Sequence, residues 1–153
     1  MRRMSGIGMG VLAAAALCVA ATARAQAPND AQIAAIVVAA NQVDIDAGKL
    51  ATTKAANPEV KAFGQMMVTD HSGVNKQATE LVTKLGVKPE DGPTAQSLKS
   101  GGAANMKNLE SLSGAAFDKA YIDQEVTYHQ AVLDAMDKTL IPNAQNAELK
   151  ALL

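Results

Sequence analysis

The chain has 153 residues, with 14 basic and 15 acidic residues and a formal net charge of −1. This balance, together with only two phenylalanines, two tyrosines and no tryptophan, argues against nucleic acid as a partner, because such binding needs a basic face. The single cysteine, Cys18, excludes both a disulfide within the chain and a site built from several thiolates.

The first 25 residues have the pattern of a secretory signal peptide. Arg2 and Arg3 form a basic start, residues 7–21 are nearly all apolar or small, and Ala23-Arg24-Ala25 fits a cleavage site. The apolar run is short for a membrane span. We therefore expect cleavage after residue 25 and export to the periplasm or outer cell envelope. Residues 26–153 would then form one cysteine-free domain with eleven lysines, fifteen acids and a net charge near −4.

Two long helices are predicted in the first half of this domain. Apolar residues recur at helical spacing from Asp30, a candidate N-cap, to about Ala56. Asn57-Pro58-Glu59 then predicts a new helix, because it supplies a capping side chain, a proline at the first helical position and an acid in the first turn. This second helix is expected to end at Gly86.

A weaker third helix is predicted between Thr94 and Leu112, after a turn-rich connection. Gly101 and Gly102 lower its intrinsic stability, and we interpret it as a short crossover between the main helices. The connection itself is the segment Lys88–Pro93.

The last long helix is predicted from Gly114 to about Leu140, with Ser113 as its cap. Pro142 breaks it, and a further helix has only begun at Leu153. No segment alternates as a strand would. The sequence therefore predicts an all-α fold, a four-helix bundle of the ferritin-like kind with a short crossover helix and an incomplete last helix.

Both histidines of the chain interrupt apolar stripes at heptad spacing. One stripe has His71 at its centre, and the other has Glu125 and His129 at consecutive positions. Such stripes pack against partner helices, and burying a carboxylate is costly unless it is paired or bound to a cation. The residues of the first stripe are Val60, Gly64, Met67, His71, Val74, Ala78, Leu81 and Leu85, and those of the second are Ile122, Glu125, His129, Val132 and Met136.

Helix geometry predicts that these polar residues lie at one level of the bundle. The tight turn at Asn57 makes the first two helices antiparallel, which places Asp44 opposite His71. If the third helix carries the chain back, His71 and His129 both lie roughly 20 Å from the same end, at about 1.5 Å per residue. Asp46 points more to one side and is a weaker candidate.

We therefore expect a metal site formed by Asp44, His71, Glu125 and His129. Imidazole and carboxylate ligands suit iron, manganese or zinc. The alternative is a buried hydrogen-bond cluster without metal, because single buried histidines are commonly satisfied by hydroxyls or carbonyls. Neither histidine has the Glu-x-x-His spacing of di-iron bundles, since valines stand three residues before them, so the sequence does not predict ferroxidase chemistry.

With these residues in view, the chain resembles the domain-of-unknown-function 4142 family, whose members are exported bacterial proteins often labelled outer membrane proteins. The resemblance implies a ferritin-like helical bundle and an envelope location, but no particular activity. It covers most of residues 30–153. The matching stretches are Asp44-Ile-Asp-Ala-Gly-Lys-Leu-Ala51, Asn57-Pro-Glu-Val-Lys-Ala-Phe63, Met67-Val-Thr-Asp-His71, Phe117-Asp-Lys-Ala-Tyr121 and Glu125-Val-Thr-Tyr-His129.

The chain departs from the family pattern at three points. Aspartates stand at positions 44 and 46, where the family often has glutamates, and Tyr128 rather than an aspartate precedes His129. The family's last helix normally continues beyond the position of Leu153. From this we expect an apolar groove along the other helices, with marginal stability as a monomer or filling of the groove by self-association or another protein.

Two functional hypotheses follow from the sequence. The first is an envelope protein with the ferritin-like bundle that binds a metal ion at the four polar residues, and the second is a non-enzymatic structural or partner-binding module. Hydrolytic catalysis lacks support, because no motif places a serine or cysteine nucleophile beside a histidine. The sequence on balance favours a protein that is not an enzyme.

Overall fold

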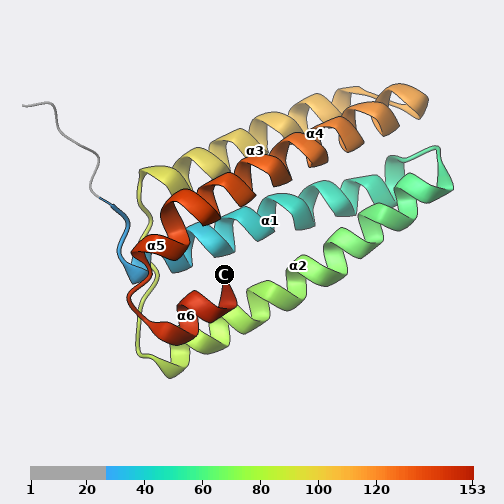
Figure 1. Cartoon of the computed structure of the whole chain (residues 1–153). Helices are drawn as coiled ribbons and strands as arrows, with labels where there is room; N and C mark the ends of the chain where they lie inside the picture. Colours follow the sequence, from blue (N-terminus) through green and yellow to red (C-terminus); the bar gives the residue numbers. More distant parts are fainter. Residues whose placement is uncertain (1–26) are drawn as a thin grey trace, which may run out of the picture.

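Figure 1 presents the computed structural model, which describes residues 27–153. The predicted signal peptide, residues 1–25, lies outside the described residues. This part of the chain is helical and contains no strand, which confirms the predicted all-α bundle. None of its helices is long and apolar enough to cross a membrane. The elements are α1 (Asp30–Lys54), α2 (Pro58–Lys84), α3 (Pro93–Ser111), α4 (Gly114–Ala135), the π-helical turn η1 (Met136–Leu140), α5 (Ile141–Asn143) and α6 (Ala147–Leu152).

The first two helices begin at side-chain caps. Asn29, rather than the expected Asp30, is the N-cap of α1 and forms a capping box with Gln32. The Asn57 side chain caps α2 by accepting a hydrogen bond from the Glu59 backbone N–H, as predicted. These side chains satisfy N–H groups that have no partner within the helix.

The third helix is longer than the short crossover expected from the sequence. It has 19 residues and runs back beside α1, so that α4 begins at the same end of the bundle as α2 (Figure 1). A Cβ atom at Gly102 would lie 2.7 Å from Cγ2 of Val43. The glycine that weakens this helix in isolation therefore allows α3 to approach α1 closely.

A pair of glycines sets the close approach of α1 and α2. A Cβ atom at Gly48 would lie 2.7 Å from the Gly64 carbonyl oxygen, and one at Gly64 would lie 2.8 Å from the Ala51 Cβ atom. These distances are too short for real side-chain contacts. The contact lies one turn along α1 from Asp44 and two turns along α2 from His71, and thus helps to bring these residues together.

Two aspartates hold the turns that precede α2 and α6. The Asp118 carboxylate, on α4, accepts hydrogen bonds from two backbone N–H groups of the α1–α2 turn, at 3.0 and 2.8 Å. The Asp30 carboxylate, on α1, accepts two equivalent bonds from the turn before α6, at 2.8 and 3.0 Å. Each turn is therefore tied to a helix distant in sequence.

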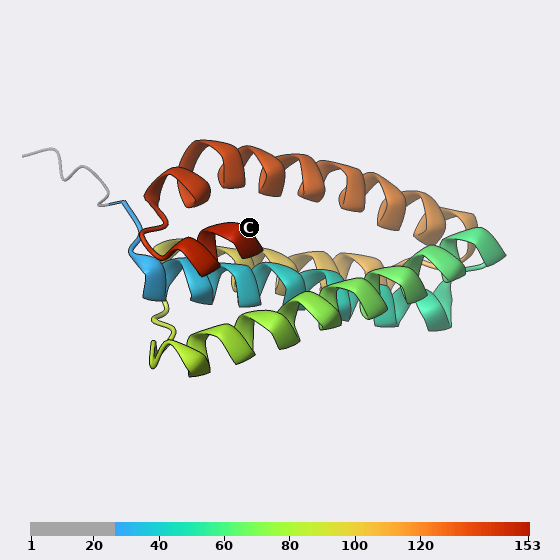
Figure 2. The same cartoon turned by 60° about the horizontal axis from the view of Figure 1, so that its bottom comes forward.

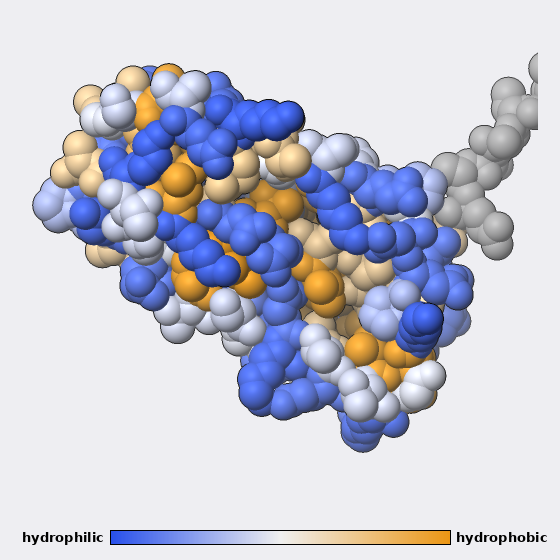
Figure 3. Space-filling model, turned by 180° about the vertical axis from the view of Figure 1, so that it is seen from behind, coloured by the Kyte–Doolittle hydropathy of each residue, from blue (hydrophilic) through white to orange (hydrophobic). Residues whose placement is uncertain are grey.

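The helices leave hollows on two faces of the molecule. Figure 2 shows α6 lying at one end of the space between α2 and α4, next to the first turns of α1. The face seen from behind has apolar side chains in a hollow between hydrophilic ridges (Figure 3). Ala35, Val38 and Val82 of α1 and α2 line a cavity of about 590 Å³. The space between α2 and α4 contains the candidate functional site.

Candidate metal centre

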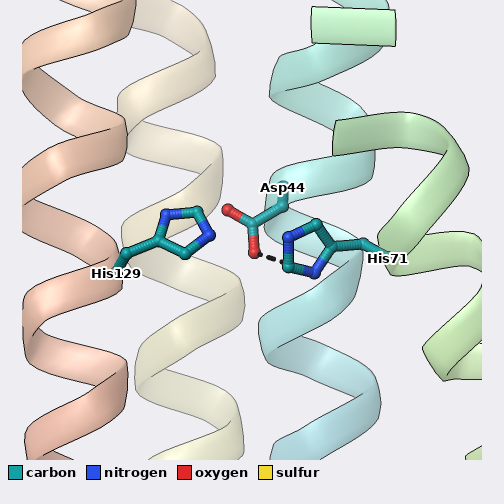
Figure 4. A group of neighbouring side chains, drawn as sticks. All are labelled: Asp44, His71 and His129. Carbon is teal, nitrogen blue, oxygen red and sulfur yellow. Dashed lines mark ion pairs between the residues drawn. The ribbon is translucent and has the colours of Figure 1, made fainter. Parts of the chain in front are cut away.

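Three of the four predicted site residues converge from three different helices. Asp44 comes from α1, His71 from α2 and His129 from α4, and one ligand atom from each lies within 4.8 Å of the others. Figure 4 shows the two imidazole rings on either side of the Asp44 carboxylate, directed toward one another. The expected common level of these residues is therefore confirmed.

The side chains of the cluster differ in their access to solvent. The Asp44 side chain is 5% exposed, that of His71 is 19% exposed and that of His129 is 38% exposed. His71 Nδ1 lies 3.5 Å from Asp44 Oδ2, and the two imidazole centroids are 5.5 Å apart. The carboxylate is thus at the bottom of the site, and His129 is on its open side.

Asn41 is a residue of the site that the sequence analysis missed. It is buried on α1, its Nδ2 donates to the Val37 carbonyl at 2.8 Å, and its Oδ1 lies 2.6 Å from His71 Nδ1. Because that oxygen can only accept, His71 Nδ1 must carry the proton. Its lone pair is therefore on Nε2. The signal available in the sequence was a polar residue directly after the apolar run of residues 33–40.

His129 is oriented in the same way by its own helix. Its Nδ1 donates to the backbone carbonyl oxygen of Glu125 at 2.9 Å, which leaves the lone pair on Nε2. Hydrogen bonding at one ring nitrogen is the arrangement that fixes metal-ligating histidines in proteins. Both histidines are therefore held in the tautomer that can ligate through Nε2.

Glu125 lies beside this cluster but outside the group of three. Its residue is 4% exposed, and its Oε2 lies 3.5 Å from His129 Nδ1. That oxygen has no hydrogen-bond partner among residues 27–153. A buried carboxylate oxygen without a partner is unfavourable, and a nearby cation would relieve it. The predicted role of Glu125 as a fourth ligand stays a prediction.

The electrostatics of the site favour a bound cation. Burial raises the pKa of Asp44 well above its usual value, and this effect is larger than the opposing effect of the contact with Glu125, which lowers that pKa. Burial and then the Asp44 charge raise the pKa of Glu125. Burial lowers the pKa of His71, and the nearby His129 lowers it further. The negative charge of Asp70 has the opposite, smaller effect. The site thus combines two carboxyl groups that resist ionisation with a neutral imidazole, and a cation would stabilise both carboxylates.

The donor set and spacing are compatible with a transition-metal ion after small side-chain movements. Bonds of about 2.1 Å in a tetrahedral site place ligand atoms roughly 3.4 Å apart. The ligand atoms here lie within 4.8 Å of one another, so side-chain rotations that move each atom by about an ångström would bring them to this spacing. The charges and donor types therefore fit a divalent ion held by two imidazoles and at least one carboxylate.

Asp46, the weaker candidate from the sequence, is not part of the cluster of three. Asp46 is partly exposed, and its Oδ1 accepts a hydrogen bond from Gln42 at 2.8 Å. This agrees with its weaker candidacy.

The comparisons with known proteins identify the class but not an activity. The chain matches the family described as "Domain of unknown function (DUF4142)" over residues 15–153, and it belongs to that family. No curated protein and no solved structure matches it.

Proposed function

We propose that this protein binds one divalent transition-metal ion at Asp44, His71 and His129, with Glu125 as a fourth ligand. The observation that carries the proposal is the convergence of ligand atoms from three helices within 4.8 Å. Two imidazoles with one or two carboxylates are a ligand set for zinc, iron or manganese. Any reaction at the metal would be a separate property, and we assign none.

The hydrogen bonds around the two histidines support this proposal over a purely structural cluster. The alternative is that the polar residues only satisfy one another in a structural or partner-binding module. Asn41 and the Glu125 carbonyl do satisfy one nitrogen of each ring. However, they leave Nε2 of each ring as the nitrogen with a lone pair, and they leave Glu125 Oε2 without a hydrogen bond among the described residues. These atoms are therefore available as ligands for a cation.

Calorimetric titration of the metal-free protein with zinc, manganese and anaerobic ferrous iron tests the proposal. We expect one ion per chain for at least one metal, and a loss of affinity of at least tenfold in His71→Ala and in His129→Ala. Glu80→Ala is the matched control, because Glu80 is an exposed acid on the same helix as His71 and lies outside the cluster. Absence of stoichiometric binding, or equal affinities in all variants, would overturn the proposal. Dioxygen consumption on adding ferrous iron would distinguish an oxidase from a storage or structural site.

The proposal also places the protein in the cell envelope. We propose that residues 1–25 are a cleaved signal peptide and that residues 26–153 form the exported ferritin-like bundle. The basic start, the apolar run and the small residues at positions 23 and 25 support this assignment. Mass spectrometry of protein recovered from the periplasmic fraction should give a chain beginning at Gln26. An uncleaved chain confined to the cytoplasm would contradict it.

A further inference from the structure

Tyr121 is a fully buried residue of α4, one helical turn before Glu125. It is 0% exposed, and its ring packs against two phenylalanines. The ring of Phe117 is stacked on it with centroids 6.2 Å apart, and that of Phe63, on α2, meets it at an angle of 60° with centroids 6.0 Å apart. These contacts hold the ring, and the hydroxyl oxygen, which lies on the ring axis, is therefore held as well.

The hydroxyl group of Tyr121 is not explained by this packing. It has no hydrogen-bond partner among residues 27–153, although these residues enclose it completely. Buried tyrosine hydroxyls usually have a partner, because an unpaired polar group inside a protein is costly. A phenylalanine at this position would make the same ring contacts without that cost.

Glu125 contains a second enclosed atom without a partner, and it is a hydrogen-bond acceptor. Its Oε2 is unpaired among the described residues. Burial and then the Asp44 charge raise the pKa of Glu125, whereas the contact with Tyr121 lowers it. Burial, and then the charges of Glu125 and Asp44, raise the pKa of Tyr121 above its usual value. The hydroxyl therefore keeps its proton and is a donor, while an ionised carboxylate only accepts.

A hydrogen bond from Tyr121 to Glu125 would satisfy both atoms at once. The ring of Tyr121 is held by its aromatic neighbours, whereas the Glu125 side chain can turn about several bonds. Such a hydrogen bond would therefore orient the carboxylate rather than the phenol. Hydrogen bonds of this kind orient the carboxylate ligands of metal ions, and removing the partner typically weakens metal binding by about 10–100-fold.

We propose that Tyr121 is a positioning residue of the metal centre. In the metal-loaded protein its hydroxyl donates a hydrogen bond to the Glu125 carboxylate and holds that carboxylate where it completes the ligand set of the ion. The inference rests on the proposed metal binding, with Glu125 as the fourth ligand, and adds a determinant of affinity to it. Tyr121 itself does not touch the ion.

Calorimetric zinc titration of Tyr121→Phe tests this role. We expect its zinc affinity to be about 10–100-fold below that of the unsubstituted protein. Tyr128→Phe is the matched control, because it removes the same group from the same helix. The Tyr128 hydroxyl donates to the Ala40 carbonyl oxygen at 3.1 Å, not to Glu125. The zinc affinity of Tyr128→Phe should therefore be nearly unchanged.

Titration of the unsubstituted protein separates this inference from the proposed function. If it binds one zinc ion per chain and Tyr121→Phe binds zinc equally well, only the positioning role is refuted. If the unsubstituted protein binds no zinc, both proposals fail.

Urea unfolding in chelator distinguishes positioning from a structural role. Tyr121→Phe removes an unpaired hydroxyl and keeps the ring, so the metal-free variant should be at least as stable as the unsubstituted protein. A lower unfolding midpoint in chelator, together with weaker zinc binding, would assign the effect to a damaged fold and overturn the proposal.

A double-mutant cycle with Glu125→Ala tests whether Tyr121 acts through Glu125. Once the carboxylate is absent, Tyr121→Phe should cause no further loss of zinc affinity. An equal loss of affinity in the presence and absence of the Glu125 carboxylate would overturn the proposal.

Infrared difference spectra give a readout that does not depend on the affinity of Glu125→Ala. In protein with isotope-labelled tyrosine rings, zinc loading should shift a tyrosine C–O band in the unsubstituted protein and in Tyr128→Phe, but not in Tyr121→Phe. Unchanged tyrosine bands in the zinc-loaded unsubstituted protein would overturn the proposal. A visible charge-transfer band on loading with ferric iron, lost in Tyr121→Phe, would make the phenolate itself a ligand and would also contradict a positioning role.

Discussion

The substitution Glu125→Gln should stabilise the metal-free protein while weakening metal binding. In the folded protein, burial and then the Asp44 charge raise the pKa of Glu125 from the usual 4.5 to about 7. One pKa unit corresponds to about 1.4 kcal/mol, so ionisation of Glu125 at pH 8 destabilises the folded state by roughly 3 kcal/mol. Because the new amide must also be buried without guaranteed partners, at a cost of about 1 kcal/mol or more, we expect a net gain of roughly 1–2 kcal/mol.

The raised pKa of Glu125 also determines how the effect of Glu125→Gln on the free energy of unfolding changes with pH. A carboxyl group with a raised pKa in the folded state binds its proton more tightly there than in the unfolded chain. Its contribution to stability is therefore fully present below pH 4.5 and is lost as the pH rises through about 7. The advantage of Glu125→Gln should thus appear above pH 4.5 and be complete at pH 8.

Urea unfolding in chelator at pH 5 and pH 8 measures this difference. Glu110→Gln is the matched control, since Glu110 is exposed on α3. We expect Glu125→Gln to raise the free energy of unfolding at pH 8 more than at pH 5, and Glu110→Gln to leave it nearly unchanged. With saturating zinc, the advantage of Glu125→Gln should shrink or reverse, because the amide is a poorer ligand than the carboxylate. An equal effect of Glu125→Gln at both pH values would refute the argument that a buried charge is strained in the metal-free site.

Three further predictions concern the scaffold and the positioning of the site. Gly64→Ala should lower the free energy of unfolding by about 1–3 kcal/mol, because the new Cβ would overlap α1; Gly73→Ala, on the same helix with no atom within 4 Å of the new Cβ, should raise it by about 0.5–1 kcal/mol. Asn41→Ala should weaken zinc binding about 10–100-fold, and NMR of the His71 ring nitrogens should detect loss of the single tautomer; unchanged spectra would contradict this role. Asp118→Ala should lower thermal stability by about 1–2 kcal/mol, since two backbone N–H groups lose a charged acceptor.

The sequence predicted the features that depend on helical periodicity and local capping. Asn57 and Pro58 define the start of α2 by local chemistry, and the interrupted stripes identify which faces of α2 and α4 turn inward. Counting residues from the shared end of the bundle then placed His71 and His129 at one level, which the structure confirms.

The parts that sequence reasoning missed depend on contacts between helices. The glycines of α3 lower helix propensity, but Gly102 fits against Val43, so tertiary packing outweighs the local preference. Likewise, the bond between Asn41 and His71 joins residues 30 positions apart and depends on the rotamers of both side chains. Heptad spacing gives the direction of a side chain but not such a partner.

The zinc K-edge X-ray absorption spectrum of the loaded protein tests the central claim most directly, because it counts the ligands of the bound ion. The proposed metal centre predicts two imidazole nitrogens and one or two carboxylate oxygens bound to the ion, with one imidazole lost in His71→Ala. A spectrum with fewer than two imidazoles in the unsubstituted protein, or an unchanged spectrum in that variant, would contradict a metal centre shared by α1, α2 and α4.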